Sequence, residues 1–332
     1  MATFRPKNFK ELEKKISHIE VKDLPLHPEN NPDNKIDEGS TGDIYKFTLR
    51  GKPAAVKAFR QQVPDIEILE IATNMLELRH ANVVRLRGYS TRPSAVLLEL
   101  CKVTVETSLG ETTVHNLGSL VRLFNKERHF NLIERLGYIH QATCGLRYLH
   151  SKGIIHRDFK PTNLLVAGTV EETVVKVADF DAFVTVKETV RSTRTKTDSR
   201  LKGMTLAYTA PELVCGRVNK ATEASDYYSW AITAFEVLCS EASAWTSVLP
   251  HLHDQILVEA LKESKRPDFY DLNRLYDHDQ LVNIQELLKR GWSQEPTERP
   301  NTEAVSNKIG LVEKQNFFRA AVSKGWDLGR QG

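Results

Sequence analysis

The chain has 332 residues, of which 40% are apolar and 27% carry a formal charge, and its net charge at pH 7 is +3. This is the composition of an ordinary soluble globular protein, long enough for two domains or for one large domain in two lobes. A net charge this small does not indicate nucleic-acid or membrane-surface partners.

The cysteines and the N-terminus bear on localisation. Neither paired spacing nor neighbouring histidines accompany the cysteines, so we expect free thiols and no zinc site. The cysteines are Cys101, Cys144, Cys215 and Cys239. Residues 1–15 are charged, unlike a signal peptide, and no apolar run approaches the roughly 20 residues of a membrane helix. We therefore expect a cytoplasmic protein with no membrane span.

The first hundred residues favour strands. Residues 1–30 contain one amphipathic pattern that predicts a helix, and a stretch rich in proline and asparagine then breaks it. Farther on, alternating apolar runs flank the turn "RGK". The expected elements are strands within 36–59, a helix at 65–79, and strands at 82–90 and 95–100.

After Cys101 the pattern changes. Residues 102–116 are polar and rich in strand-forming residues, and they predict an inserted hairpin or loop. From residue 117 onward helices dominate, and the clearest helix ends near Ser151, just before Gly153. Further helices are expected at 222–240, 253–263, 279–291 and 302–315. A small strand-rich part is therefore followed by a larger helical part.

The strongest chemical signal is "IIHRDFKPTNLLV" at 154–166, where a polar loop lies between two apolar runs. Asp158 is placed to orient a hydroxyl and accept its proton, and Lys160 would neutralise a moving phosphate. Asn163 and, sixteen residues later, Asp179 offer hard oxygen ligands that suit magnesium. Together these residues are typical of phosphoryl transfer.

The chain resembles a eukaryotic protein kinase across residues 31–310. Seven motifs follow one another in the order known for that family. They are "IDEGSTGDIY" (36–45), "AAVK" (54–57), "HRDFKPTN" (156–163), "DFD" (179–181), "APE" (210–212), "SDYYSW" (225–230) and "ERP" (298–300). The stretches "RGKPAAVKAF" and "LRHANVVRLRGY" look most like the tyrosine-kinase-like group, which includes mixed-lineage and receptor-interacting kinases.

The resemblance implies an α+β, two-lobed protein kinase fold. A small antiparallel β-sheet with one main helix would form the N-lobe, and the larger C-lobe would be mostly α-helical. The predicted organisation is an N-terminal extension at 1–30, a kinase domain at 31–310 and a C-terminal tail at 311–332. Within the domain we expect the N-lobe at 31–101, an insert at 102–116 and the C-lobe at 117–310.

The resemblance also assigns site residues, with ATP and Mg²⁺ as cofactors. Lys57, Asp158 and Lys160 would be catalytic, Lys57 by gripping the α- and β-phosphates. Asn163 and Asp179 would hold the metal. The nucleotide would be bound by Ile36, Gly39, Gly42, Ile44, Ala55, Lys57, Glu70, Leu98, Glu99, Cys101 and Leu165.

Other positions receive supporting roles from the same resemblance. Leu98 falls at the gatekeeper position, and Glu99 and Cys101 would present backbone groups at the hinge. Glu212 and Arg299 would form a buried ion pair in the C-lobe. Asp226 would hold the catalytic-loop backbone, and His156 and Phe180 would pack in the core.

Three positions depart from the family pattern. Asp37 replaces the first glycine of the nucleotide loop, and we expect weaker nucleotide affinity, limited by screening of the exposed charge. Ile71 falls where the glutamate that pairs with the strand lysine is expected, so this role goes to Glu70, with Glu67 as the alternative. Asp181 replaces the glycine after "DF". Because aspartate tolerates left-handed backbone and the metal ligands are intact, we expect altered switching rather than lost chemistry.

Residues 182–203 are rich in hydroxyls, and between 185 and 202 six basic residues stand against two acidic ones. A phosphate added here would pair with Arg157 and order the segment, which makes autophosphorylation through self-association a reasonable hypothesis. Alternatively, the basic stretch attracts an acidic substrate or partner.

The pattern of Lys160 and Thr205 resembles that of serine/threonine-specific kinases. We therefore predict a cytoplasmic signalling enzyme that transfers the γ-phosphoryl group of ATP to serine and threonine side chains of proteins. The alternative is a pseudokinase, a nucleotide-binding or scaffolding module that signals by contact. A small-molecule kinase of the same fold is disfavoured by "APE" and by the long segment before it.

Overall fold

The computed structural model describes most of the chain between residues 34 and 312. The described ranges are 34–38, 42–127, 131–179, 205–239, 254–276, 278–301 and 303–312, with positions 14, 16, 19–21, 24, 244–245 and 248–249. Gly39 and residues 180–204 lie outside them.

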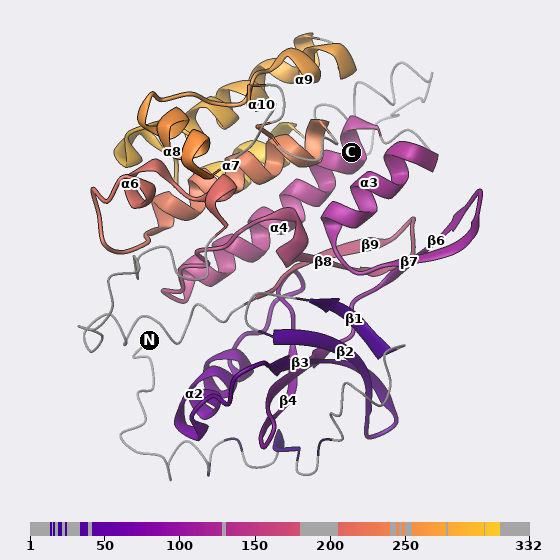
Figure 1. The fold of residues 1–332 in the computed structure, drawn as a ribbon. Helices are drawn as coiled ribbons and strands as arrows, with labels where there is room; N and C mark the ends of the chain where they lie inside the picture. Colours follow the sequence, from indigo (N-terminus) through magenta and orange to yellow (C-terminus); the bar gives the residue numbers. More distant parts are fainter. Residues whose placement is uncertain are drawn as a thin grey trace, which may run out of the picture.

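Five antiparallel strands form the sheet of the N-lobe, in the spatial order β1-β2-β3-β5-β4 (Figure 1). They are β1 (Lys35–Glu38), β2 (Gly42–Leu49), β3 (Lys52–Phe59), β4 (Leu86–Thr91) and β5 (Ser94–Glu99). Helix α2 (Asp65–Leu76) packs against β4 and β5 through Ile68, Ile71 and Met75, which recur at the spacing of one helical face. The helix ends at Leu76, with Glu77 at the C-cap position, rather than at residue 79.

Leu24 and Val21, two described residues of the N-terminal segment, pack against one face of this sheet. Val56 is paired with Leu97 across β3 and β5, so both side chains lie on the same face, and both are fully buried. Leu24 packs into the same cluster. Nearby, the Val21 N–H donates a hydrogen bond to the Tyr89 carbonyl at 2.7 Å, which attaches the segment to β4 at the edge of the sheet.

Two small hairpins lie between the N-lobe sheet and the helices (Figure 1). Strands β6 (Val103–Thr107) and β7 (Gly110–Val114) form the hairpin expected within 102–116. Strands β8 (Leu164–Gly168) and β9 (Thr173–Val177) pair directly after the polar loop at 156–163, which is the predicted catalytic loop. Asn116 forms an isolated bridge with Leu165, so the first hairpin is joined to the second.

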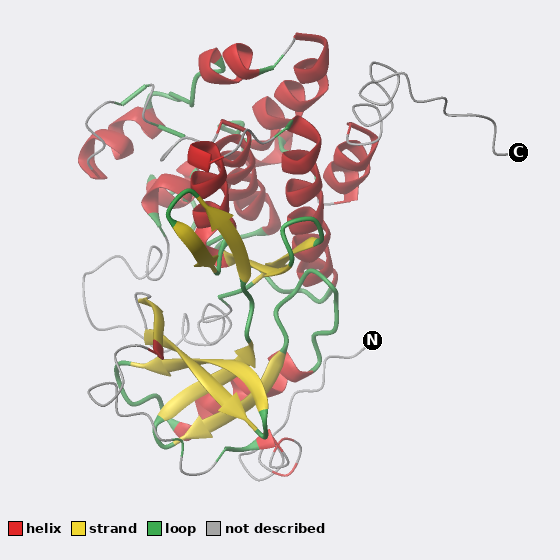
Figure 2. Ribbon diagram, turned by 90° about the vertical axis from the view of Figure 1, so that its right-hand side faces the viewer, coloured by secondary structure: helices red, strands yellow, loops and turns green. Residues whose placement is uncertain are grey.

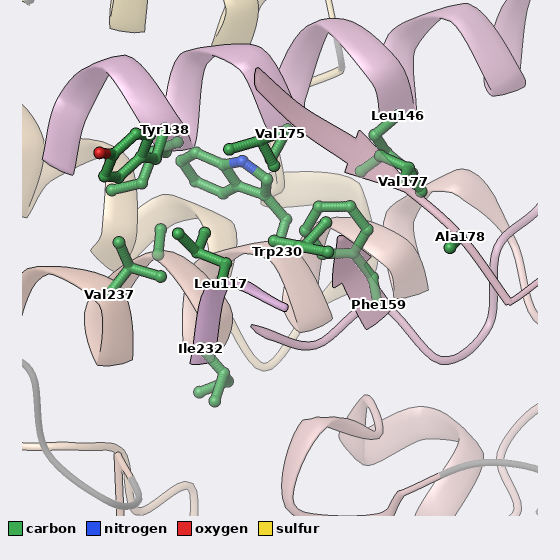
Figure 3. Packing of buried hydrophobic residues seen from close by; sticks show 14 of the residues in the cluster. Leu117, Tyr138, Leu146, Phe159, Val175, Val177, Ala178, Trp230, Ile232 and Val237 are labelled. Carbon is green, nitrogen blue, oxygen red and sulfur yellow. The ribbon is translucent and has the colours of Figure 1, made fainter. Parts of the chain in front are cut away.

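The C-lobe is helical, and the helices gather at the end of the molecule opposite the N-lobe sheet (Figure 2). Its elements are α3 (Leu117–Glu127), α4 (Leu132–Ser151), η4 (Pro161–Asn163), η6 (Leu206–Tyr208), α6 (Pro211–Val214), α7 (Glu223–Cys239), α8 (Asp254–Lys262), α9 (Tyr270–Leu275), α10 (His278–Gly291), η7 (Pro296–Glu298) and a helix at 303–312. Helix α7 is buried from Ser225 to Cys239. Figure 3 shows Trp230 of α7 and Phe159 of the catalytic loop in the same buried layer.

These elements confirm the predicted α+β architecture of a small antiparallel sheet with one main helix and a larger helical lobe. Helices α7, α8 and α10 lie within a residue or so of their expected bounds. Helix α9 was not expected from the sequence, because six residues are too few to show a periodic pattern.

Gly145, on α4, lets the helix approach the N-lobe closely. A Cβ at this position would lie 2.3 Å from the Asn82 carbonyl oxygen and 2.6 Å from a methyl group of Val177. The Asn82 carbonyl accepts a hydrogen bond from the Val177 N–H, so it cannot move freely. We expect Gly145→Ala to lower the free energy of unfolding, because overpacking costs about 1–3 kcal/mol and exceeds the roughly 1 kcal/mol gained in helix propensity.

Urea unfolding followed by circular dichroism measures this difference. Arg147→Ala, at an exposed position of the same helix, is the control and should change stability by less than about 0.5 kcal/mol. A Gly145→Ala protein more stable than the wild type would contradict the close approach.

Candidate active site

The loop after α4 is held by the carboxylate of Asp226, in the first turn of α7. Asp226 is fully buried, and its Oδ2 accepts hydrogen bonds from the His156 N–H at 2.7 Å and from His150 Nε2 at 2.8 Å. Its Oδ1 accepts from the Arg157 N–H at 2.8 Å. These bonds confirm the predicted role of Asp226. They also hold Arg157 at φ 73°, a left-handed conformation that non-glycine residues rarely adopt.

Three further polar residues follow on the same face of α7, at spacings of three or four residues. Ser229 donates a hydrogen bond to the Tyr208 carbonyl at 2.7 Å, and Thr233 donates to the Phe159 carbonyl at 3.1 Å. Glu236 accepts from the Tyr208 hydroxyl at 2.6 Å. Because α7 is buried, its polar side chains need partners inside the protein, and these partners are the loops of the site.

Asp158 lies at the centre of the catalytic loop and is bonded through both carboxylate oxygens. Its Oδ2 is 2.6 Å from Lys160 Nζ and accepts a hydrogen bond from Asn163 Nδ2 at 2.9 Å. Its Oδ1 accepts from the Thr205 N–H at 3.0 Å. Lys160 also donates to the Thr205 hydroxyl at 2.5 Å. The structure thus brings together the three loop residues predicted from the sequence and adds Thr205 to them.

Lys57 and Asp179 form an ion pair between the N-lobe sheet and the end of the β8–β9 hairpin, with 2.7 Å between Nζ and Oδ1. Lys57 is buried, and Asp179 has a φ of 69°. Burial by itself would raise the pKa of Asp179, but the charge and the hydrogen bond of Lys57 outweigh it and hold the pKa below its ordinary value. Asp179 is therefore ionised at neutral pH, as a metal ligand or a partner of a cation must be.

Asn163 and Asp179 lie beside each other at the open end of the β8–β9 hairpin. The Ala178 N–H donates to the Asn163 carbonyl at 2.9 Å, which extends the strand pairing up to Asp179. Asn163 uses its amide nitrogen to bond Asp158, so its side-chain oxygen remains as a possible metal ligand. An amide oxygen and a carboxylate form the hard donor set that Mg²⁺ prefers, so these residues fit the predicted metal.

The predicted base-binding residues share one face of the N-lobe sheet. Ile44 is paired with Lys57 across β2 and β3, and Ala55 is paired with Leu98 across β3 and β5. Since Ala55 and Lys57 are two residues apart on one strand, all four side chains lie on the same face. Ile44, Ala55 and Leu98 are only partly buried, and so is Leu165 on β8. The structure thus leaves an incompletely buried apolar surface beside the buried lysine.

The predicted nucleotide loop spans residues 36–45. The structure describes residues 36–38 and 42–45, whereas Gly39 lies outside the described residues. Ile36, in β1, is partly buried, and Asp37 is exposed. Gly42 begins β2, and a Cβ there would lie 2.2 Å from the Ala58 carbonyl oxygen. Only glycine fits at this position, which explains why this residue type stands there.

The hinge residues are held by contacts on both sides. The Glu99 carboxylate lies 3.0 Å from Lys176 Nζ and accepts a hydrogen bond from the Arg85 N–H. Cys101 is buried, and burial raises the pKa of its thiol to about 12. The Cys101 carbonyl is 2.7 Å from Nδ1 of His115, a contact that the sequence did not indicate.

The acidic partner of Lys57 on α2 stays a prediction. Glu67 and Glu70 are both partly buried, and Ile71 is buried against the core. The carboxylate of Asp179, on β9's side of the site, lies within ion-pair distance of Lys57. Phe180, Asp181 and the basic segment at 182–203 lie outside the described residues.

Glu212 and Arg299 form the buried ion pair that was predicted. Arg299 Nη1 and Nη2 donate to the two carboxylate oxygens of Glu212, each at 2.8 Å. Both side chains are almost completely buried, and the Arg299 guanidinium also donates to the Ala224 and Ser293 carbonyls. The pair connects α6, which contains Glu212, to the end of η7, where Arg299 lies.

Glu236 is a second buried acid that the sequence did not single out. Burial raises its pKa to about 7, although hydrogen bonds from the Tyr208 hydroxyl and from the Ala244 N–H, together with the nearby charge of Arg122, oppose this shift. Its place three residues after Thr233 on the polar face of α7 is the signal that would have found it.

The comparison with known families agrees with this geometry. A family model described as protein tyrosine and serine/threonine kinase matches residues 31–309, most of the chain. The chain belongs to the protein kinase family. This result confirms the resemblance drawn from the motifs and, with the elements above, the kinase fold.

Curated relatives of this kinase are similar to it at low identity. It is 26% identical over 283 residues to the proto-oncogene serine/threonine-protein kinase mos of Sus scrofa, an alignment that covers 82% of this kinase and 77% of the relative. It is 28% identical over 288 residues to the dual specificity protein kinase shkD of Dictyostelium discoideum. It is also 28% identical over 249 residues to receptor-interacting serine/threonine-protein kinase 1 of Homo sapiens. The last two alignments cover 83% and 73% of this kinase, but 34% of each relative.

Two further expectations concern the thiols and the membrane. All four cysteines lie in described ranges, and none of them forms a disulfide there. Within the described part of the kinase, no helix combines the length and the apolar character that crossing a bilayer requires.

We expect Asp226→Asn to destabilise the kinase. The amide of asparagine keeps one acceptor oxygen, so its NH₂ group would face the N–H of either His156 or Arg157 with a donor in place of an acceptor, and an unsatisfied buried group costs about 1–3 kcal/mol. Chemical unfolding measures the loss. The control is Glu223→Gln, a half-exposed acid 3.8 Å from His150, for which we expect a change below about 0.5 kcal/mol. Equal stability of Asp226→Asn and wild type would contradict the anchoring role.

The stability of the kinase should also depend on Glu236. Because its folded pKa of about 7 exceeds that of the unfolded carboxyl, the folded state binds the extra proton. Binding of this proton stabilises the folded state. The stabilisation is complete at low pH and is lost as the pH rises through about 7. In Glu236→Gln, the amide oxygen can still accept from Ala244 N–H and the amide nitrogen can donate to Tyr208, so we expect this loss to disappear.

Thermal unfolding between about pH 5.5 and pH 8 tests this expectation, because the wild type should lose more stability over that range than Glu236→Gln. Glu303→Gln, at an exposed position, should keep the wild-type profile. Identical profiles for wild type and Glu236→Gln would show that Glu236 does not titrate in this range.

Proposed function

We propose that this kinase transfers the γ-phosphoryl group of ATP to serine and threonine hydroxyls of proteins, with Mg²⁺ as its cofactor. The observation that carries the proposal is the setting of Asp158, whose carboxylate is held by Lys160, Asn163 and the Thr205 N–H. The contact between Lys160 and Thr205 and the serine/threonine kinases among the relatives support this acceptor class.

In this proposal Asp158 is the general base. The substrate hydroxyl oxygen bonds to the γ-phosphorus, the bond from that phosphorus to the β–γ bridging oxygen breaks, and ADP leaves. The hydroxyl proton passes to the Asp158 carboxylate. Lys160, 2.6 Å from that carboxylate, neutralises charge on the transferred group, and Lys57 binds the α- and β-phosphates.

Asn163 and Asp179 would hold Mg²⁺, which supplies positive charge to the phosphate oxygens. The adenine would lie on the partly buried face formed by Ile44, Ala55 and Leu98. Ile36, Gly39, Gly42, Leu165 and backbone groups of Glu99 and Cys101 complete this proposed nucleotide site, with Glu70 as the partner of Lys57 on α2.

Phosphorylation of the basic segment at 182–203 would regulate the enzyme. Arg157 Nε is buried and has no hydrogen-bond partner in the described part of the chain. Burial lowers the pKa of Arg157, opposed by the charge of Asp226, so an anion at this position would be favourable. A phosphate on the segment would supply that anion. Autophosphorylation through self-association, signalling and a cytoplasmic location belong to this proposal.

The direct test is phosphate transfer from radiolabelled ATP and Mg²⁺ to casein and myelin basic protein. We expect Asp158→Asn to lower kcat about 10²–10⁴-fold, because a general base contributes that much, and Lys57→Ala to lower it at least about 10²-fold. Lys126→Ala, at an exposed position of α3, should retain wild-type activity.

Mass spectrometry of the same reactions tests autophosphorylation, which requires phosphate on 182–203 in the wild type and less in Asp158→Asn. Thermal stabilisation by ATP without transfer in the wild type would contradict the catalytic proposal and support the pseudokinase alternative, which the departures at Asp37 and Asp181 motivate.

A further inference from the structure

The base of the predicted nucleotide loop carries acidic groups on both of its strands. Glu38, the last residue of β1, is paired with Asp43 of β2, so two like charges lie directly opposite each other. Asp37 is a third acid at this place, and its Oδ1 accepts a hydrogen bond from the Glu38 N–H at 2.8 Å. Like charges at directly opposed positions destabilise a strand pair, and carboxylates near a phosphate chain repel it. These acids therefore need cations beside them.

Two cations supply this charge, and each of them reaches both carboxylates of the opposed pair. Arg60, directly after β3, places Nη2 2.5 Å from Glu38 Oε1 and 2.9 Å from Asp43 Oδ1. Lys35, at the start of β1, places Nζ 3.1 Å from Glu38 Oε2 and 3.3 Å from Asp43 Oδ1. We call these four residues the charge ring. Its two positive charges balance its two negative charges.

The charge ring is partly open to water, since the side chain of Glu38 is 63% exposed and that of Asp43 is 21% exposed. Burial by itself would raise the pKa of Asp43, but hydrogen bonds from Arg60 and Lys35 outweigh it and hold the pKa below its ordinary value. Asp43 is therefore ionised at neutral pH. Isolated ion pairs at exposed positions contribute little, but charges that share their partners form a network and act together.

The charge ring joins three strands of the site. The acids lie on β1 and β2, and Arg60 follows the last residue of β3. Strand β3 also carries Lys57, three residues before Arg60, which the proposed function assigns to the α- and β-phosphates. Asp43 is next to Ile44, which is paired with Lys57 across β2 and β3. Arg60 thus connects both strands of the predicted nucleotide loop to the strand that bears the lysine.

We propose that Arg60 is a positioning residue for the nucleotide. It holds Glu38 and Asp43 together, which keeps β1 and β2 paired at the base of the predicted loop. It also neutralises carboxylates that would repel the phosphates, and it acts through the loop rather than on the reacting atoms. In this way a loop with three acids is compatible with a polyanionic ligand. This inference rests on the proposed function, because it requires that ATP binds beside β1 and β2.

Steady-state phosphate transfer from ATP to casein by the full chain, with Mg²⁺, tests the proposal. We expect Arg60→Ala to raise KM for ATP about three- to tenfold, the size of ionic and cross-strand effects at exposed positions, and to leave kcat within about twofold. Arg60→Lys should retain part of the affinity, because lysine keeps the charge but lacks the planar fork. Because the effect is ionic, the difference in KM between wild type and Arg60→Ala should shrink at about 0.5 M NaCl.

The double variant Glu38→Gln with Arg60→Ala separates this role from a general loss of structure. Without the charge of Glu38, no like-charge pair remains, and Asp43 keeps Lys35 as its partner. The KM for ATP should therefore return to within about twofold of the wild-type value instead of rising further. The control is Lys52→Ala, which removes a positive charge at an exposed position at the other end of β3 and should keep the wild-type KM.

Three results in an active wild type would overturn the positioning role and leave the kinase proposal intact. They are an unchanged KM in Arg60→Ala, a fall in its kcat as large as the rise in KM, and a double variant whose KM is no lower than that of Arg60→Ala. Absence of phosphate transfer by the folded wild type would overturn the proposed function and this inference with it.

Discussion

The geometry of the site depends on one constraint: a carboxylate buried inside the protein must be paired. Asp226 has no exposed surface, and an unpaired charge there would cost many kcal/mol. The N–H groups of His156 and Arg157 supply the partners, and in doing so they hold the loop in a left-handed conformation that it would not adopt alone. The position of Asp158, the next residue, follows from this anchor. Ser229 and Thr233, on the same face of α7, donate hydrogen bonds to the carbonyls of Tyr208 and Phe159 and so hold the backbone at these two positions.

The ion pair between Lys57 and Asp179 has a different role. Lys57 is buried, and removing an ammonium from water is costly, so such a pair is weak evidence for stability. In the proposed function it is a charge arrangement for a polyphosphate, in which the amine of Lys57 and the proposed metal ligand Asp179 are held within reach of the same group. The positions that depart from the family pattern are Asp37, Ile71 and Asp181. Lys57 and Asp179 are not among them.

The sequence predicts those features that rest on local patterns or on the order of motifs. Apolar periodicity located α7 and α10, and the order of the motifs placed Lys57, Asp158 and Asp226 in one site. Contacts between segments distant along the chain were not predictable, because no local pattern encodes them. The bond from His115 to Cys101 arises only when the hairpin closes, and the approach of Gly145 to Asn82 depends on how a helix packs against a loop. Glu236 is an intermediate case, since its helix was predicted but its buried partner was not.

The central claim is that two carboxylates and an amide, held by α7 and by the β8–β9 hairpin, act together with the amine of Lys57 on β3 on the phosphates of one nucleotide. The most direct measurement is a crystal structure of the full chain with a non-hydrolysable ATP analogue and Mg²⁺. The account predicts that Lys57 contacts the α- and β-phosphates, that Asn163 and Asp179 bind the metal, and that Asp158 faces the γ-phosphate from the side of an incoming hydroxyl. A nucleotide bound elsewhere, or these side chains turned away from the phosphates, would contradict it.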